Sequence, residues 1–454
     1  MATDERSYRV DLLTRVEGEG RFTLRMKGGV VEQAELAIFE APRFYEAFLR
    51  GRSMHEVSDI VARICGICPV AYQLSAAAAL EAALGLEVPE AIAKLRRLLY
   101  CGEWIESHAL HVFMLHAPDY LGYPSAIEMA RDHRELVEQG LALKKTGNRI
   151  LEVLGGRATH PISPRIGGFS KLPTRAELSA LLPQLERALE IAEATAALVA
   201  SWPAQELEVP YVFVSLECDE YPLERGTGLL VGGPGSAEGT YRVGYDAWDQ
   251  HFVESHVAHS NALHCHLKDG STYLAGPQAR LFHHAEKLHP RARAALDATG
   301  LGSVVTNPYR SIVVRAVELV HAAAEAIDLV RAYEPPSAAY VPSTLRAATG
   351  AGATEAPRGA LFHRYAIDAE GLVSDAKIVP PTSQNQARIE KDLATLGPEL
   401  AAMSHQEATH RCEQLIRAYD PCISCATHFL RLDIAELGDS DTGEAPTGGE
   451  GGAT

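Results

Sequence analysis

Two pairs of cysteines with the same spacing lie near opposite ends of this 454-residue chain. Cys65 and Cys68 stand in "ARICGICPVAYQ", and Cys422 and Cys425 stand in "DPCISCATH". Four thiolates are the number of ligands that a soft tetrahedral metal site needs. Zinc ribbons usually place their two pairs close together, whereas most of this chain separates them. A site built from both pairs must be assembled by the whole fold, which favours the centre of an enzyme over a local structural staple.

Spacing alone leaves a redox or structural role open for the paired cysteines. Pro69 suits the first turn of a helix that "LSAAAALEAALG" continues, so a helix dipole would stabilise thiolates at its start. The remaining cysteines stand alone, and we expect them to be ordinary thiols; they are Cys101, Cys218, Cys265 and Cys412.

Composition excludes several classes of protein. A formal net charge of -17 argues against a nucleic-acid-binding surface, which needs a basic excess. No apolar run reaches the roughly 18 residues of a membrane span. The start of the chain lacks the basic and apolar segments of a secretory signal. We therefore expect a cytoplasmic protein, in which cysteines are more often thiols or metal ligands than disulfides.

Residue patterning predicts an α+β fold that is mainly helical. Residues 8–42 form the expected N-terminal β region, with a hairpin around Gly28–Gly29. Thr174 and Glu177 are placed as a helix capping box. Helical periodicity is clear in three further segments; these cover residues 89–113, 311–333 and 399–419. Two stretches rich in glycine and proline are expected to be irregular; these are residues 222–239 and 333–360.

Beyond spacing, "RICGICP" and "DPCISCATH" resemble the two signature segments of the nickel–iron hydrogenase large subunit. In the same order as in that family, "TRVEGEG", "PRFYEAFLRGR", "SHALHVF", "EAPRGALFH" and "PPTSQNQARIE" resemble further segments, so the similarity covers about residues 8–428. The residues in these segments are most similar to those of the cytoplasmic, pyridine-nucleotide-linked branch that includes the sulfhydrogenases. The resemblance implies that family's fold and the reversible heterolytic splitting of dihydrogen.

The resemblance also implies a nickel–iron centre whose iron carries cyanide and carbon monoxide. By position, Cys65 and Cys422 would be terminal ligands of nickel, whereas Cys68 and Cys425 would bridge nickel and iron. Soft anionic sulfur suits both metals.

Five further residues are implied to surround this centre. Glu17 matches the family's proton-relay glutamate, Arg358 matches an arginine beside the metals, and Asp420 matches the carboxylate that orients this arginine. Pro357 and Ser383 would lie at the cofactor. From the residues alone, Glu17 reads as a solvated strand-end carboxylate, Arg358 as a surface arginine and Asp420 as a turn residue before proline.

Magnesium is implied by Glu46 and His428, with a backbone carbonyl near Gln386 as the third protein ligand. Such a hard cation prefers oxygen ligands, so water should complete its shell. His108 and His111 share one helical face and resemble buried hydrogen-bonding residues near the site, although a packing role alone is the alternative.

Two positions depart from the family pattern. Tyr72 replaces a histidine that many members carry, and a tyrosine cannot carry a proton near pH 7 as imidazole does. Ser107 replaces an aspartate that helps to hold the arginine. These departures affect proton traffic and not metal assembly, because all four cysteines are present.

After the metals take four cysteines, no cluster-binding set remains. The resemblance therefore implies an iron–sulfur small subunit, with flavin- and NAD(P)-binding subunits beyond it; sulfur as acceptor, or a deazaflavin-type partner set, is the alternative. A maturation endopeptidase would cut after His428, which would leave residues 1–428 as one catalytic body and remove the acidic, Gly-rich residues 429–454, expected to be disordered. Two other classes remain as rivals, a zinc-binding protein and a non-catalytic, complex-I-like structural subunit.

Overall fold

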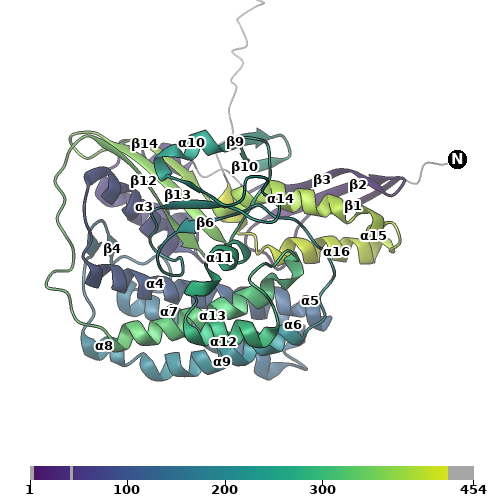
Figure 1. Cartoon of the computed structure of the whole chain (residues 1–454), viewed down its shortest axis with the longest axis horizontal. Helices are drawn as coiled ribbons and strands as arrows, with labels where there is room; N and C mark the ends of the chain where they lie inside the picture. Colours follow the sequence, from purple (N-terminus) through teal and green to yellow (C-terminus); the bar gives the residue numbers. More distant parts are fainter. Residues whose placement is uncertain (1–4, 41–43, 428–454) are drawn as a thin grey trace, which may run out of the picture.

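The computed structural model describes residues 5–40 and 44–427, so His428 and the tail at 429–454 lie outside the described residues (Figure 1). The described chain is mainly helical with several small, mostly antiparallel sheets, which confirms the predicted α+β class. Within the described residues, no helix combines the length and apolar character that crossing a bilayer would require.

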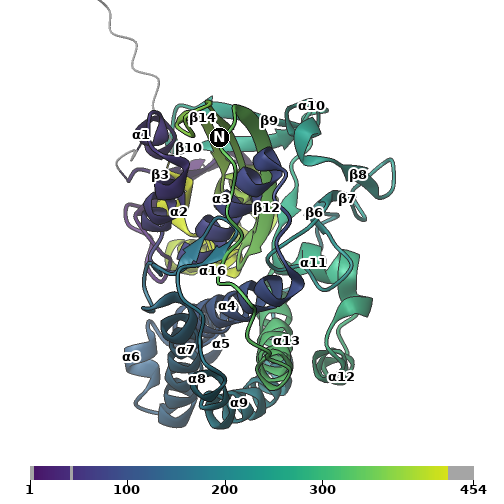
Figure 2. The same ribbon diagram turned by 90° about the vertical axis from the view of Figure 1, so that its left-hand side faces the viewer.

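A layer of long helices forms one side of the molecule (Figure 2). The helices of this layer are α4 (Glu90–Ala109), α7 (Arg134–Gly155), α9 (Leu182–Ser201), α12 (Pro290–Thr299) and α13 (Ser311–Arg331). Two of the predicted helical segments are thereby confirmed as α4 and α13. Small residues let α4 and α7 approach closely, because a Cβ atom on Gly147 would lie 2.5 Å from the carbonyl oxygen of Gly102.

The N-terminal sheet contains β1 (Glu5–Val10), β2 (Gly20–Lys27) and β3 (Val30–Ile38), all antiparallel. The predicted hairpin is confirmed: Gly28 and Gly29 connect β2 to β3 with φ angles of 59° and 80°, which favour glycine. Helices α14 (Pro381–Thr395) and α16 (His405–Ala418) pack on this sheet (Figure 1).

A second sheet contains β12 (Ala348–Ala356), β13 (Gly359–Ile367) and β14 (Val373–Val379), and α3 (Pro69–Leu84) lies across it. The prediction that residues 333–360 are irregular is therefore wrong for β12. Glycine and alanine are rare in strands, but here they admit α3: a Cβ atom on Gly350 would lie 2.3 Å from the backbone nitrogen of Ala83.

Two other boundaries differ from the predictions. The irregular segment 222–239 contains β7 (Gly228–Gly232), which pairs with β6 (Phe213–Glu217). The helix predicted over 399–419 instead begins at His405, because Ser404 and Glu407 form a capping box there. The capping box predicted at Thr174 and Glu177 is confirmed at the start of α8 (Arg175–Ser179).

Candidate metal centre

The fold brings the two distant cysteine pairs together in a buried cluster. The sulfur atoms of Cys65 and Cys422 are 3.5 Å apart, as are those of Cys68 and Cys425. Between Cys422 and Cys425 the distance is 2.7 Å, and all four sulfurs lie within 4.8 Å of one another. Each of the four residues is at least 95% buried. This geometry presents four soft donors to a single point inside the protein.

The first pair is fixed by the start of α3. Cys68 is the N-cap residue, and the backbone N–H groups of Ile67 and Cys68 both point at the sulfur of Cys65, at 3.3 Å. The buried carboxylate of Glu103 accepts the N–H groups of Val70 at 2.6 Å and of Ala71 at 3.1 Å. Thus Glu103 caps the helix that follows Cys68, a role that the sequence pattern did not predict.

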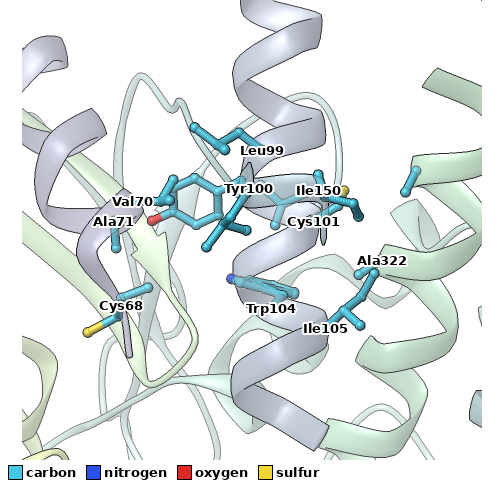
Figure 3. Packing of buried hydrophobic residues seen from close by; sticks show 14 of the residues in the cluster. Cys68, Val70, Ala71, Leu99, Tyr100, Cys101, Trp104, Ile105, Ile150 and Ala322 are labelled. Atoms are coloured by element: carbon cyan, nitrogen blue, oxygen red, sulfur yellow. The ribbon is translucent and has the colours of Figure 1, made fainter. Parts of the chain in front are cut away.

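Figure 3 shows how the side chains behind the first pair pack. The sulfur of Cys68 points away from the packed side chains of Tyr100 and Trp104 on α4. The Tyr100 hydroxyl forms a 2.6 Å hydrogen bond with the hydroxyl of Thr354 on β12, so its polar atom is satisfied inside the core. The segment that carries Cys65 and Cys68 therefore packs against both α4 and the sheet behind α3.

The second pair lies around the short helix α17 (Ile423–Ala426). The backbone N–H of Cys422 donates to the hydroxyl of Thr382, at 3.0 Å, and the Tyr72 hydroxyl donates to the backbone oxygen of Cys425, at 3.4 Å. Thr382 is a second residue in contact with the cysteine cluster that the sequence motifs did not identify. Its hydroxyl in "PPTSQN" was the available signal, but the family resemblance pointed to the neighbouring Ser383.

Without a cation, four thiolates cannot coexist at these distances. Burial is the main cause that raises the pKa of Cys422 and the pKa of Cys425 above the ordinary thiol value. A bound metal ion reverses this cost, because it deprotonates its coordinating thiols. The donor chemistry and the close spacing of the sulfurs therefore fit a soft metal centre.

Glu17 is placed directly against Cys422. Its carboxylate oxygen Oε2 lies 3.1 Å from the Cys422 sulfur and accepts the backbone N–H of Ser424, at 3.0 Å. Burial, followed by the negative charge of Cys65, raises the pKa of Glu17. Gly18 permits this approach, since it has a φ of 88° and a Cβ atom there would lie 2.8 Å from the Cβ of Ile423.

Arg358 lies in the turn between β12 and β13 and is 98% buried. Its guanidinium donates to the backbone oxygen of Asp420 at 2.8 Å, to the carboxylate of Asp420 at 3.0 Å and to the hydroxyl of Ser107 at 3.2 Å. Burial lowers the pKa of Arg358, but Asp420 and the cysteine thiolates outweigh this effect and raise the pKa above its usual value. Ser107 thus contacts the arginine although it lacks the charge of an aspartate.

A network of buried charges holds the turn that carries Arg358. Arg280 forms ion pairs with Glu318 at 2.8 Å and with Glu355 at 2.9 Å, and it donates to the backbone oxygen of Pro357 at 3.0 Å. The predicted buried histidines lie beside this region. His108 contacts Glu318 at 2.9 Å. A backbone oxygen lies 2.8 Å from His111 Nε2. Both histidines are buried and hydrogen-bonded, as expected.

Glu46 and Gln386 are the described residues that were predicted to lie near magnesium. Glu46 accepts the backbone N–H of Ile378, at 2.7 Å, and lines a cavity with Ile378, Cys425 and Thr427. Gln386 directs its side-chain amide to the backbone oxygen of Leu36 (2.6 Å) and to a buried serine hydroxyl (2.9 Å). The backbone carbonyl near Gln386 stays a prediction for the third magnesium ligand.

Ser383 is buried next to the second cysteine pair. Its hydroxyl donates to the backbone oxygen of Ala426, at 3.4 Å. His428 lies outside the described residues, so its predicted part in a magnesium site is not placed.

Comparison with known sequences agrees with this geometry. A family model described as "Nickel-dependent hydrogenase" matches residues 43–140 and 302–428. The alpha subunit of sulfhydrogenase 2 from Pyrococcus furiosus is 34% identical over 93% of this chain and 99% of its own length. One subunit of the F420-non-reducing hydrogenase from Methanothermobacter marburgensis is 30% identical over 94% of this chain and 97% of its own length.

Solved structures show the same fold. An NAD+-reducing [NiFe]-hydrogenase in the H2-reduced state superposes with a TM-score of 0.85 at 30% identity, covering 93% of this chain and 99% of the other. The Ni-Fe-Se hydrogenase from D. vulgaris Hildenborough has a TM-score of 0.75 at 21% identity over 93% of this chain and the whole of the other, a likeness of fold. The identity to the sulfhydrogenase protein over nearly the whole chain, together with the four converging cysteines, shows that this chain belongs to the nickel-dependent hydrogenase family.

Proposed function

We propose that this subunit oxidises dihydrogen reversibly at a nickel–iron centre held by Cys65, Cys68, Cys422 and Cys425. The observation that carries the proposal is the convergence of these four buried sulfurs within 4.8 Å, from two segments at opposite ends of the chain. When bound, such a centre supplies an electron-rich metal pair that splits dihydrogen and accepts its electrons. The cyanide and carbon monoxide ligands of the iron are part of this proposal.

The chain provides a route for the proton. A proton on the sulfur of Cys422 faces the carboxylate of Glu17 across 3.1 Å, a hydrogen-bond distance for sulfur. Proton transfer is favoured when donor and acceptor have similar pKa values. Because the pKa of Glu17 is raised, it differs less from the pKa of a thiol than the pKa of an exposed glutamate does. Glu17 is therefore assigned as the first proton acceptor beyond the thiolate.

Arg358 supplies fixed positive charge. Because Asp420 and Ser107 bind three of its guanidinium nitrogens, the side chain has one orientation and a charge that persists at every physiological pH. A preorganised cation in a dry site stabilises charge that develops during reaction. We assign Arg358 to this role, with Asp420 as its positioning residue, and we place Pro357 and Ser383 at the rim of the cofactor.

Magnesium is proposed near Glu46. This carboxylate lines the cavity that also borders Cys425 and Thr427, the residue before His428. A hard cation there would take oxygen ligands and water, with His428 as its nitrogen ligand. The third protein ligand is proposed to be a backbone carbonyl near Gln386.

The names of the relatives support a proposal for the electron route. The matched proteins are named as subunits of sulfhydrogenases and of F420-non-reducing hydrogenases, and the structural neighbour is an NAD+-reducing enzyme. We propose that this chain works in the cytoplasm with an iron–sulfur small subunit, together with flavin- and NAD(P)-binding subunits. We also propose that an endopeptidase removes residues 429–454, which an intact-mass measurement on the nickel-loaded protein would test. A C-terminus at His428 supports removal, whereas a mass that includes Thr454 refutes it.

The test of the function combines metal analysis with hydrogen uptake. The purified complex should contain nickel and iron and reduce a dye with dihydrogen. Replacing any of the four cysteines by alanine should abolish both nickel retention and uptake, since the site needs every thiolate. Cys412→Ala is the matched control, because Cys412 is equally buried but lies in another core cluster. Zinc alone in the native complex, or normal uptake by a Cys65→Ala variant, would refute the proposal.

A further inference from the structure

A second group of potential metal ligands lies apart from the four cysteines. His259, His264 and Glu390 place one ligand atom each within 4.8 Å of the others. The Nε2 atom of His259 is 2.8 Å from the Oε1 atom of Glu390, and the Nε2 atom of His264 is 3.5 Å from the same oxygen. Two imidazoles and one carboxylate therefore converge on one point.

Two elements supply these side chains. The histidines come from the hairpin of β9 (Phe252–Val257) and β10 (Ser260–Leu267), and Glu390 comes from α14, which packs against β10 (Figure 1). The register of the hairpin shifts between Ser260 and His264, as at a β-bulge. Bulges redirect side chains, and this one lies where His264 turns toward α14.

The carboxylate is held in place by the backbone. Oε1 of Glu390 accepts the N–H of Leu36 on β3, at 2.9 Å. One turn earlier on the same face of α14, Gln386 binds the carbonyl of the same residue, at 2.6 Å. These two contacts fix α14 against β3 and hold the carboxylate of Glu390 where it faces the hairpin.

His264 carries an unsatisfied nitrogen. Its side chain is 94% buried, and its Nε2 atom has no hydrogen-bond partner among the described residues although it points toward Glu390. A buried polar atom without a partner destabilises the folded state, and a ligand that binds this atom removes that cost. In contrast, His259 and Glu390 are 19% and 13% exposed, which leaves a side open to solvent.

The spacing suits a metal ion. Two ligand atoms that each lie about 2.1 Å from a metal are about 3.0–3.4 Å apart at the usual bond angles. The observed distances of 2.8 and 3.5 Å bracket this range. Imidazole nitrogen with one carboxylate is the ligand set of zinc and of non-haem iron, with the remaining positions open to water.

We propose that His259, His264 and Glu390 form a second metal site. This site would bind a divalent first-row transition-metal ion such as zinc. The ion would fasten the β9–β10 hairpin to α14. That hairpin pairs at Ala262 with Thr427, at the end of the described chain, so the ion would stiffen the strand on which the second cysteine segment ends.

Glu35 supports the assignment as an outer carboxylate. Its Oε1 atom lies 3.8 Å from the Nδ1 atom of His259, on the opposite side of the ring from Glu390. Metal-binding histidines usually direct their second nitrogen to a carboxylate, and loss of such a partner weakens binding about 10- to 100-fold.

Cobalt(II) binding to the purified, nickel-loaded complex tests the proposal. We expect one additional ion per chain, with d–d absorption but without the thiolate-to-cobalt charge transfer that a cysteine site would show. His264→Ala and Glu390→Gln should lose this ion, and zinc should raise the melting temperature of the native complex but not that of the variants. Glu35→Gln should weaken binding about 10- to 100-fold.

His256→Ala is the matched control, since His256 is an exposed residue of the same hairpin; this variant should bind like the native protein. If His264→Ala does not fold, His259→Ala at its more exposed position carries the test. No additional ion in the native complex, a spectrum with thiolate charge transfer, or full binding by a folded His259→Ala variant would overturn the proposal. A simple histidine–glutamate ion pair would produce the first of these results.

Discussion

The carboxylate of Glu17 and the sulfur of Cys422 lie 3.1 Å apart although they are separated by almost the whole chain. Their backbones also form an isolated parallel bridge, in which the N–H of Ile423 donates to the carbonyl of Glu17 at 2.9 Å. The pairing of side chains is thus fixed by a pairing of backbones. A fixed contact of this kind is what a proton relay needs, because proton transfer depends steeply on distance.

Glu17→Gln should retain nickel and iron but lose proton transfer. The amide preserves the shape of the side chain and cannot titrate, so hydrogen–deuterium exchange and hydrogen-dependent dye reduction should both fall, by roughly 10²- to 10⁴-fold. Glu19→Gln, at an exposed position two residues away, is the control and should behave like the native enzyme. Native rates for the Glu17→Gln variant would remove Glu17 from the relay.

Arg358→Lys should lose most activity while the metals stay bound. Lysine keeps the charge, but it lacks the planar fork that contacts Asp420 twice and Ser107 once. We expect turnover to fall about ten- to a thousandfold, the scale for one preorganised donor. Arg364→Lys on the neighbouring strand β13 is the control, since its ion pair with Asp249 is partly exposed. Unchanged turnover would show that Arg358 does not act in the reaction.

The candidate site residues could be predicted from the sequence because chemistry demands particular side chains at particular spacings. The cysteine pairs, Glu17 and Arg358 were all proposed from short motifs; the structure buries the four cysteines and Arg358 and places Glu17 against Cys422. The glycine pair of the N-terminal hairpin was equally clear, since positive φ angles restrict the choice of residue.

Features that depend on tertiary packing were not readable. Strand β12 consists largely of glycine, alanine and threonine, and only the close approach of α3 explains why it is a strand. Likewise, Glu103 resembles any other polar position of a helix, and only the contact of its carboxylate with the start of α3 reveals its role. Ile378 lies beside Glu46 through a backbone contact, which leaves no trace in residue identity.

Acid should weaken the fold through His363, which is fully buried on β13. Burial lowers its pKa from 6.5 to about 3. As the pH falls below 6.5, the unfolded chain takes up a proton that the folded chain does not, so stability is lost with falling pH. One such group costs about 1.6 kcal/mol between pH 6.5 and 5. The free energy of unfolding in urea, measured at both pH values, should differ less for His363→Gln than for the native protein. An equal difference in the two proteins would contradict the role of His363. The control variant His256→Gln should show the same difference as the native protein.

Glu103 links the stability of α3 to the position of Cys68. Its carboxylate accepts the N–H groups of Val70 and Ala71, the second and third residues after the cysteine. A helix start has unpaired N–H groups, and a buried one without an acceptor is costly. Burial raises the pKa of Glu103, and the two N–H groups of α3 that it accepts oppose this rise.

Glu103→Gln should therefore shift the first cysteine pair rather than remove it. The amide keeps one acceptor oxygen but turns a donor toward a backbone N–H, so we expect a loss of about 1–3 kcal/mol of stability. A purely structural role would change only the melting temperature. A positioning role would also lower nickel occupancy and move the infrared bands of the proposed cyanide and carbon monoxide ligands, because the family resemblance implies that Cys68 would bridge nickel and iron. Glu90→Gln, at the exposed start of the same helix α4, should change neither. Unshifted bands with full nickel occupancy in a destabilised Glu103→Gln variant would restrict Glu103 to capping α3.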